Sequence, residues 1–139
     1  MARGPIEQQM EAAAHRYFAC VTKGDVDSIL ALFADDARLI NPMTGEDGIQ
    51  GKAALRTFYQ QLVSSLVDYQ AVATDIVIEG NTLVAPLHLE GKTPDGQPIA
   101  MNNLNFWTFE AGKFKILRIY MDTHPYRQAL DQALAGGKP

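Results

Sequence analysis

The hydrophobic periodicity changes once along this chain, and the change limits the folds that the chain can adopt. Up to about residue 67 most apolar residues recur every three or four positions, whereas from residue 71 to 122 the pattern is strand-like. The first spacing indicates amphipathic helices and the second indicates half-buried strands. Helices in one block and strands in another favour an α+β fold, in which three N-terminal helices pack on one face of a strongly curved antiparallel sheet.

Capping and turn residues set the boundaries of the expected elements. Asp25 is a suitable N-cap for the second helix, which Asp35 and Asp36 close. The helices are expected over residues 6–21, 26–33 and 52–67, with a short strand over 37–41 and a loop over 42–51. Four further strands, joined by hairpin turns, are expected over 71–79, 82–90, 99–109 and 114–122. Pro125 begins a last short helix that carries Leu130 and Leu134.

Composition and charge narrow the classes of function. The 139 residues are 47% hydrophobic and 20% charged, which is typical of one globular domain. We expect that domain to cover 1–139, with a folded core from about residue 6 to 134 and a frayed tail. The net charge is −4 and the basic residues are scattered, so no nucleic-acid partner is expected.

Cofactor and compartment follow from what the chain lacks. Cys20 is alone, so neither an intramolecular disulfide nor a cysteine-based metal site can form, and the three histidines lie on different elements. The chain has no glycine motif that would bind a phosphate or a dinucleotide. We therefore expect no metal and no cofactor. No apolar run has the length of a signal segment or a membrane span, so a cytoplasmic location and no membrane partner are expected.

Two asparagines interrupt an apolar face of the strand expected over 99–109. Asn103 and Asn105 share that face with Met101, Trp107 and Phe109. Buried amides cost free energy unless they are hydrogen-bonded, so this pair indicates a polar site, bound water or a solvated face.

The order of several motifs resembles one superfamily. The run from Ala31 to Pro42, continued by Gly51 to Tyr59, is similar to the signature of the nuclear-transport-factor-2-like superfamily, in particular its ketosteroid-isomerase and SnoaL-like polyketide-cyclase branches. Residues 15–17, 95–100 and 117–122 follow in the order typical of these branches, so the resemblance covers about residues 7–130. It implies a cone-shaped sheet with the helices on its concave face, and a pocket for a small hydrophobic molecule.

The resemblance also implies roles for individual residues. Tyr17 matches the tyrosine that donates a hydrogen bond to the developing oxyanion, and Tyr59 matches a supporting tyrosine. Asn41 stands where the isomerases have the aspartate that carries the proton, and Asn105 stands where they have a second, protonated aspartate. An amide at position 105 can still donate to an oxyanion. Asn41 cannot accept a proton at neutral pH, so the usual isomerase mechanism does not carry over unchanged.

A different base is therefore needed if the chain is an enzyme. His88 aligns with a pocket-lining position of the isomerases, and the ordinary pKa of histidine, about 6.5, suits a neutral-pH base. A lone strand histidine is also commonly structural. Asp122 is the next carboxylate, but its expected position next to Arg118 favours a cap or an ion pair. The pocket is expected to be lined by Phe33, Phe58, Tyr59, Asn103, Trp107, Leu117, Ile119 and Met121.

Three functions remain open at this stage. The first is an isomerase or cyclase that stabilises an enolate of a steroid- or polyketide-like carbonyl compound, and the second is a non-catalytic binding protein. The third is an epoxide hydrolase, for which Asn41 fits but Leu39 replaces the required tyrosine. A homodimer is expected through the outer face of the sheet, where an apolar patch would otherwise be exposed. That patch is expected to contain Leu83, Ala85, Leu87, Leu89, Leu104 and Phe106.

Overall fold

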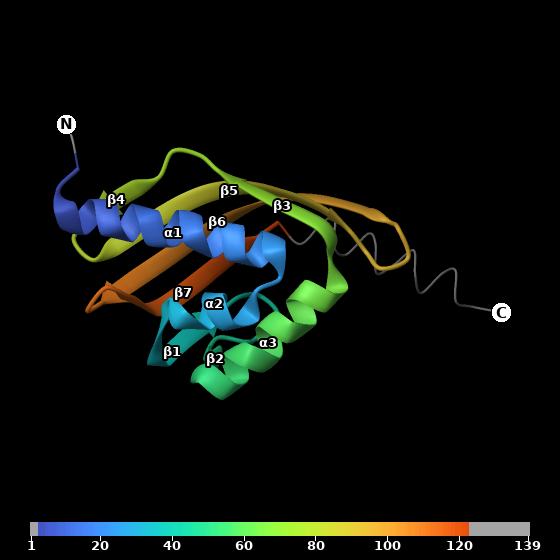
Figure 1. Cartoon of the computed structure of the whole chain (residues 1–139), viewed down its shortest axis with the longest axis horizontal. Coiled ribbons are helices and arrows are strands. Elements are labelled where there is room, and N and C mark those ends of the chain that lie inside the picture. Colours follow the sequence, from blue (N-terminus) through green and yellow to red (C-terminus); the bar gives the residue numbers. More distant parts are fainter. Residues whose placement is uncertain (1–2, 123–139) are drawn as a thin grey trace.

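The computed structural model describes residues 3–122, so the helix expected after Pro125 and the expected frayed tail lie outside the described residues. The helices in this part of the chain are α1 (Pro5–Lys23), α2 (Val26–Ala31) and α3 (Lys52–Ser65). The strands are β1 (Phe33–Ile40), β2 (Ile49–Gln50), β3 (Val67–Ala73), β4 (Val77–Glu79), β5 (Thr82–Lys92), β6 (Pro98–Glu110) and β7 (Lys113–Met121). Figure 1 shows the helices against one face of the sheet, which confirms the α+β class.

Local signals explain where the first two helices meet. Gly24 adopts a left-handed conformation, with φ of 72°, at the C-terminus of α1, and its N–H donates to the carbonyl of Val21. Asp25 then caps α2, because its carboxylate accepts hydrogen bonds from the backbone N–H and the hydroxyl of Ser28, at 3.1 and 2.6 Å. The N-cap expected from the sequence is therefore confirmed.

The sheet is mixed rather than wholly antiparallel. Its strand order is β2-β1-β7-β6-β5-β3, with β4 paired to β5, and all pairs are antiparallel except β1 with β7. A parallel pair needs a long crossover connection, and here α3 together with β3 to β6 supplies it. Phe33 already belongs to β1 instead of the second helix, and the expected strand 71–79 is broken into β3 and β4.

The pairing register decides which residues of β5 face the helices. Leu83 pairs with Trp107 and Ala85 pairs with Asn105, so these residues share the inner face of the sheet. The expectation that the Leu83 series lies on the outer face is wrong. All four of its members on β5 are buried, namely Leu83, Ala85, Leu87 and Leu89. Leu104 and Phe106 do lie on the outer face, opposite Pro86 and Val84.

Aromatic rings fill one end of the space between the helices and the sheet. The Trp107 ring lies 5.6 Å from Tyr17, 5.7 Å from Phe18 and 5.5 Å from Phe114, measured between centroids. Phe33 contacts Phe114 edge-on at 5.1 Å. Such rings bury much apolar area and pack in edge-to-face geometry, so the inner face is dry and rigid around Trp107.

Candidate active site

A row of residues crosses the inner face of the sheet next to this aromatic cluster. Ala85 pairs with Asn105, and Asn105 pairs with Ile119. On the other side of β7, Ile40 pairs with Arg118 at the end of the parallel ladder, and Asn41 follows directly after β1, next in register to Ile119. Asn105 is 4% exposed and Asn41 is 8% exposed, and they are the two buried polar residues among the described ones. The row thus joins two buried amides through one aliphatic residue.

Tyr17 and Tyr59 bring two phenols to the same interior. Tyr17 comes from α1 and Tyr59 from α3, and their hydroxyl oxygens are 2.9 Å apart, which is a hydrogen bond. Burial raises the pKa of both phenols well above its ordinary value of about 10. Both side chains therefore remain neutral donors at physiological pH.

Tyr69 is a third interior phenol, which the sequence analysis missed. It lies on β3, packs against the core, and has its pKa raised to about 12 by burial. It lies close enough to Tyr17 that a charge on one phenol would disfavour a charge on the other. The expected strand began at residue 71, two positions later. Extending the alternation of Ala71 and Ala73 backwards would have placed Tyr69 on the same face.

Asn41 has its side-chain oxygen occupied by the loop that follows β1. Its Oδ1 accepts hydrogen bonds from the backbone N–H groups of Met43 and Thr44, at 2.8 and 3.1 Å. Its own N–H donates to the Thr44 hydroxyl at 3.0 Å. This turn fixes the orientation of the amide. Its Nδ2 group makes no hydrogen bond within residues 3–122 and remains available as a donor.

The inward-facing polar atoms of β6 are unpaired. Asn103 Oδ1 and Trp107 Nε1 are buried and lack a hydrogen-bond partner in the described part of the chain. The side chain of Asn105, between them on the strand, likewise makes no hydrogen bond to another described residue. Buried polar groups are usually satisfied, so two buried unpaired atoms, one on each side of Asn105 along the strand, are typical of a site that receives a ligand or ordered water.

His88 does not face this interior. Its side chain is half exposed on the outer face of β5, where Nδ1 lies 2.9 Å from Asn102 Oδ1 and Nε2 lies 3.2 Å from Glu90 Oε1. These hydrogen bonds, that to Asn102 first, raise its pKa above the usual value. The expectation that His88 faces the pocket is wrong, because the face of β5 that meets Trp107 carries its odd-numbered residues.

The apolar residues expected to line the pocket lie on the inner side, whereas Asp122 does not. Asp122 is exposed, as are Arg118 and Tyr120, on the face opposite the interior. The remaining residues expected to line the pocket are buried or packed against the core, namely Phe33, Phe58, Leu117, Ile119 and Met121. Among residues 3–122 no group of three His, Cys, Asp or Glu side chains could hold a metal ion, and no helix is long and apolar enough to cross a membrane.

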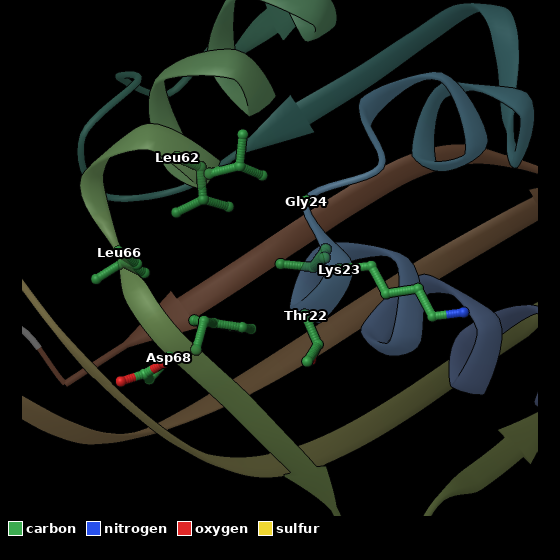
Figure 2. A pocket seen from close by; sticks show the side chains of 9 residues that line it. Thr22, Lys23, Gly24, Leu62, Leu66 and Asp68 are labelled. Atoms are coloured by element: carbon green, nitrogen blue, oxygen red, sulfur yellow. The ribbon is translucent and has the colours of Figure 1, made fainter.

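A small cavity adjoins this site at the C-terminal ends of α1 and α3. It has a volume of about 120 Å³, and Tyr69 lines it. Figure 2 shows Leu62 of α3 and Leu66, just after the helix, on one side and the end of α1 on the other, with Lys23 and Asp68 pointing in opposite directions. The volume is enough for a few water molecules. It is too small for a drug-sized ligand, so we regard it as a space beside the phenols.

The polar row, the phenol pair and the helix-on-sheet arrangement can be compared with known proteins. The family model of the SnoaL-like domain matches residues 14–117, most of the chain. The chain belongs to the SnoaL-like domain family. This SnoaL-like chain is also 36% identical over 72 residues to Steroid Delta-isomerase from Nocardioides simplex. That match covers 52% of this chain and 58% of the relative, so it spans less than two thirds of the relative's length.

Solved structures share the fold of the SnoaL-like chain. One, provisionally assigned as a SnoaL-like polyketide cyclase from Jannaschia sp. CCS1, is similar with a TM-score of 0.79 at 20% identity, over 100% of this chain and 99% of that one. SalBIII, an epoxide hydrolase/cyclase-like enzyme with a role in pyran ring formation in salinomycin, is similar with a TM-score of 0.73 at 23% identity, over 83% and 92%. TerC, co-crystallised with polyporic acid, has a TM-score of 0.75 at 19% identity, over 88% and 98%. These similarities confirm the predicted α+β fold, and the family model confirms the predicted SnoaL-like membership.

Proposed function

We propose that this SnoaL-like chain binds a small hydrophobic carbonyl compound between its helices and sheet, and catalyses isomerisation or cyclisation by stabilising the enolate. The observation that carries the proposal is the buried hydrogen bond of 2.9 Å between Tyr17 and Tyr59, in an interior that also contains the buried amides of Asn41 and Asn105. The steroid isomerase relative and the fold shared with cyclase-like enzymes support the same class of reaction.

The phenol pair suits an oxyanion site. The hydrogen bond from Tyr59 lowers the pKa of Tyr17 against the larger effect of burial, which raises it. In the proposed complex the Tyr59 hydroxyl donates to the Tyr17 oxygen, and the Tyr17 hydroxyl donates to the substrate oxygen. Asn105 supplies a second N–H donor to that oxygen. Oriented donors in a dry site stabilise charge that develops in the transition state, because they need little reorganisation.

The reaction also needs a base to remove a proton from the substrate, and the interior lacks an obvious one among the described residues. The buried polar residues among those described are Asn41 and Asn105, and neither can accept a proton at neutral pH. With His88 on the outer face, a bound water or the substrate itself must carry the proton. Substrates with an acidic α-hydrogen, such as polyketide-like β-ketones, need the weakest base and therefore fit this interior better than a simple ketone does.

The proposed function is tested by turnover of three substrates: a 3-oxo-Δ5-steroid, a polyketide-like β-ketone and an epoxide. We expect activity on the β-ketone or the steroid, and a loss of roughly 100- to 1,000-fold in kcat for Tyr17→Phe, since one oxyanion donor is removed. Tyr120→Phe is the matched control, because Tyr120 is 57% exposed on the far side of β7. Turnover of the epoxide alone would instead assign the epoxide-hydrolase alternative.

A non-catalytic binding protein is the second candidate, and the missing interior base favours it. In that case the same amides and phenols hold a hydrophobic ligand without chemistry. Tight binding of the steroid or the β-ketone, without turnover of any of the three substrates, would decide for binding.

We also propose a homodimer through the outer face of the sheet. Val84, Pro86, Leu104 and Phe106 pair across β5 and β6 to form an apolar patch on this face. Tyr120 extends the patch on β7, opposite Leu104. An apolar sheet face of this kind is typical of an isologous contact between two copies.

A further inference from the structure

The unpaired oxygen of Asn103 has no explanation within the proposed oxyanion site. Asn103 stands on the inner face of β6, and its Oδ1 is buried without a hydrogen-bond partner in the described residues. Its neighbours across the sheet are Leu87 on β5 and Met121 on β7, and neither side chain has a hydrogen atom that it can donate. Asn102, the adjacent amide on the outer face, is by contrast paired with His88.

The direction in which a ligand can extend follows from the packing. A ligand oxygen held beside Asn105 has Trp107 on one side along β6, where the rings of Tyr17, Phe18 and Phe114 fill the space. The other direction along the strand leads to Asn103. Two residues on one face of a strand are roughly 7 Å apart, so Asn103 lies about one ring's length beyond the oxyanion site.

We infer that Asn103 Oδ1 accepts a hydrogen bond from a hydroxyl group of the ligand, on the side away from the enolate oxygen. The inference rests on the proposed function, because it places the reacting oxygen beside Tyr17 and Asn105. It narrows the substrate class to flat, apolar ring compounds that carry a carbonyl or enol oxygen at one end and a hydroxyl at the other. An ether or a hydrogen at the second position leaves the Asn103 oxygen unpaired and buried, which costs affinity.

Three fluorescent naphthols test the inference by equilibrium binding to the full chain: 2-naphthol, 6-methoxy-2-naphthol and 2,6-dihydroxynaphthalene. The 2-hydroxyl of each stands in for the enol oxygen. The methoxy compound can accept a hydrogen bond at position 6 but cannot donate one. After correction for its two equivalent ends, the diol is expected to bind roughly five- to tenfold more tightly than the methoxy compound, as one added hydrogen bond implies.

Substitutions at two neighbouring positions show where the preference arises. Asn103→Leu is expected to abolish the preference for the diol over the methoxy compound. Asn103→Asp, which keeps an acceptor oxygen, is expected to retain the preference. Asn102→Leu is the matched control, since Asn102 lies on the outer face, and it is expected to behave like the wild type.

The outcomes separate this inference from the proposed function. If 2-naphthol binds, Tyr17→Phe weakens that binding, and the diol and the methoxy compound bind equally, then the role of Asn103 is wrong and the oxyanion site stands. If the diol is preferred equally by the wild type and by Asn103→Leu, another group recognises the hydroxyl and the inference is also wrong. If none of the naphthols binds, both proposals fail.

Discussion

Asn41 differs from an aspartate only by an amide NH2 group in place of an oxygen. Its surroundings suit the substitution Asn41→Asp. In Asn41→Asp one carboxylate oxygen can keep the hydrogen bonds from Met43 and Thr44, while the other replaces Nδ2 on the unpaired side. Burial raises the pKa of such a carboxyl and the two N–H donors lower it, so a base of useful strength remains. We expect a gain in steroid isomerisation of roughly 100- to 10,000-fold, measured as the rate of enone formation.

A double variant tests whether residue 41 and Tyr17 act on the same bound substrate. Adding Tyr17→Phe to Asn41→Asp should remove most of the gain, because the base and the oxyanion donor act on one substrate. An Asn41→Asp protein that folds, binds the steroid and shows no increase in rate would mean that position 41 does not reach the substrate.

The unpaired oxygen of Asn103 also leads to a prediction about the stability of the ligand-free protein. Asn103 is partly buried and its Oδ1 is buried and unpaired, so replacing the amide with an apolar side chain of similar size removes a desolvation cost, and Asn103→Leu should raise the free energy of unfolding by about 1 kcal/mol. Asn102→Leu, on the outer face, should change it by less than about 0.5 kcal/mol at about pH 8, where the pair of Asn102 with His88 contributes little. Urea denaturation measures both. A clear loss of stability in Asn103→Leu would show that its oxygen is already satisfied.

At the scale of single elements, the helices were the most predictable part of the chain. Their apolar spacing and the Asp25 cap are local signals, and the structure places all three helices within a few residues of the expected bounds. Local sequence signals do not determine which face of β5 points into the core. Both of its faces carry apolar residues, Leu83 and Leu87 on one and Val84 and Pro86 on the other, so alternation alone separates two faces without saying which is inside. The register with Trp107 decides it.

Some residues of the candidate site were predicted correctly from the sequence, and others were missed or misplaced. Tyr17, Tyr59, Asn41 and Asn105 were expected from the resemblance, and the fold brings the two phenols together. Tyr69 was missed because the expected strand began two residues too late, at residue 71. The structure extends β3 back past an irregular start, at which Asp68 has φ of 53° and the register with β5 shifts. His88 was misplaced because its assignment depended on the uncertain facing of β5.

The cross-strand contacts of His88 on β5 and β6 predict a pH dependence of stability. Its pKa is raised in the folded state by Asn102 and by Glu90, so its contribution is fully present below the unfolded pKa and disappears as the pH rises through the folded pKa. We expect His88→Gln to be less stable than the wild type at about pH 5.5 and equal to it at about pH 8, from urea midpoints. An equal deficit at both pH values would refute a role for the charged imidazole.

At the scale of the whole molecule, the outer sheet face predicts the oligomeric state. Sedimentation at micromolar concentration should show a dimer for the wild type and a monomer for Phe106→Glu, since two buried carboxylates would face the apolar patch. Ile6→Glu is the control, because Ile6 is 73% exposed on α1, which covers the opposite face of the sheet. Circular dichroism should show that both variants fold. A wild-type monomer, or a dimer that tolerates Phe106→Glu, would place the interface elsewhere.

The central position of β7 has a consequence for how the chain is made. It lies between β1 and β6 in the sheet although it is the last described strand in the sequence. During vectorial synthesis, β1 emerges from the ribosome early, and its parallel neighbour β7 follows only with residues 113–121. Until then the apolar stripe of α1 lacks the completed surface that it will cover. We therefore expect the nascent chain to expose Tyr17 and Phe18, and to be most prone to aggregation, until β7 has been released.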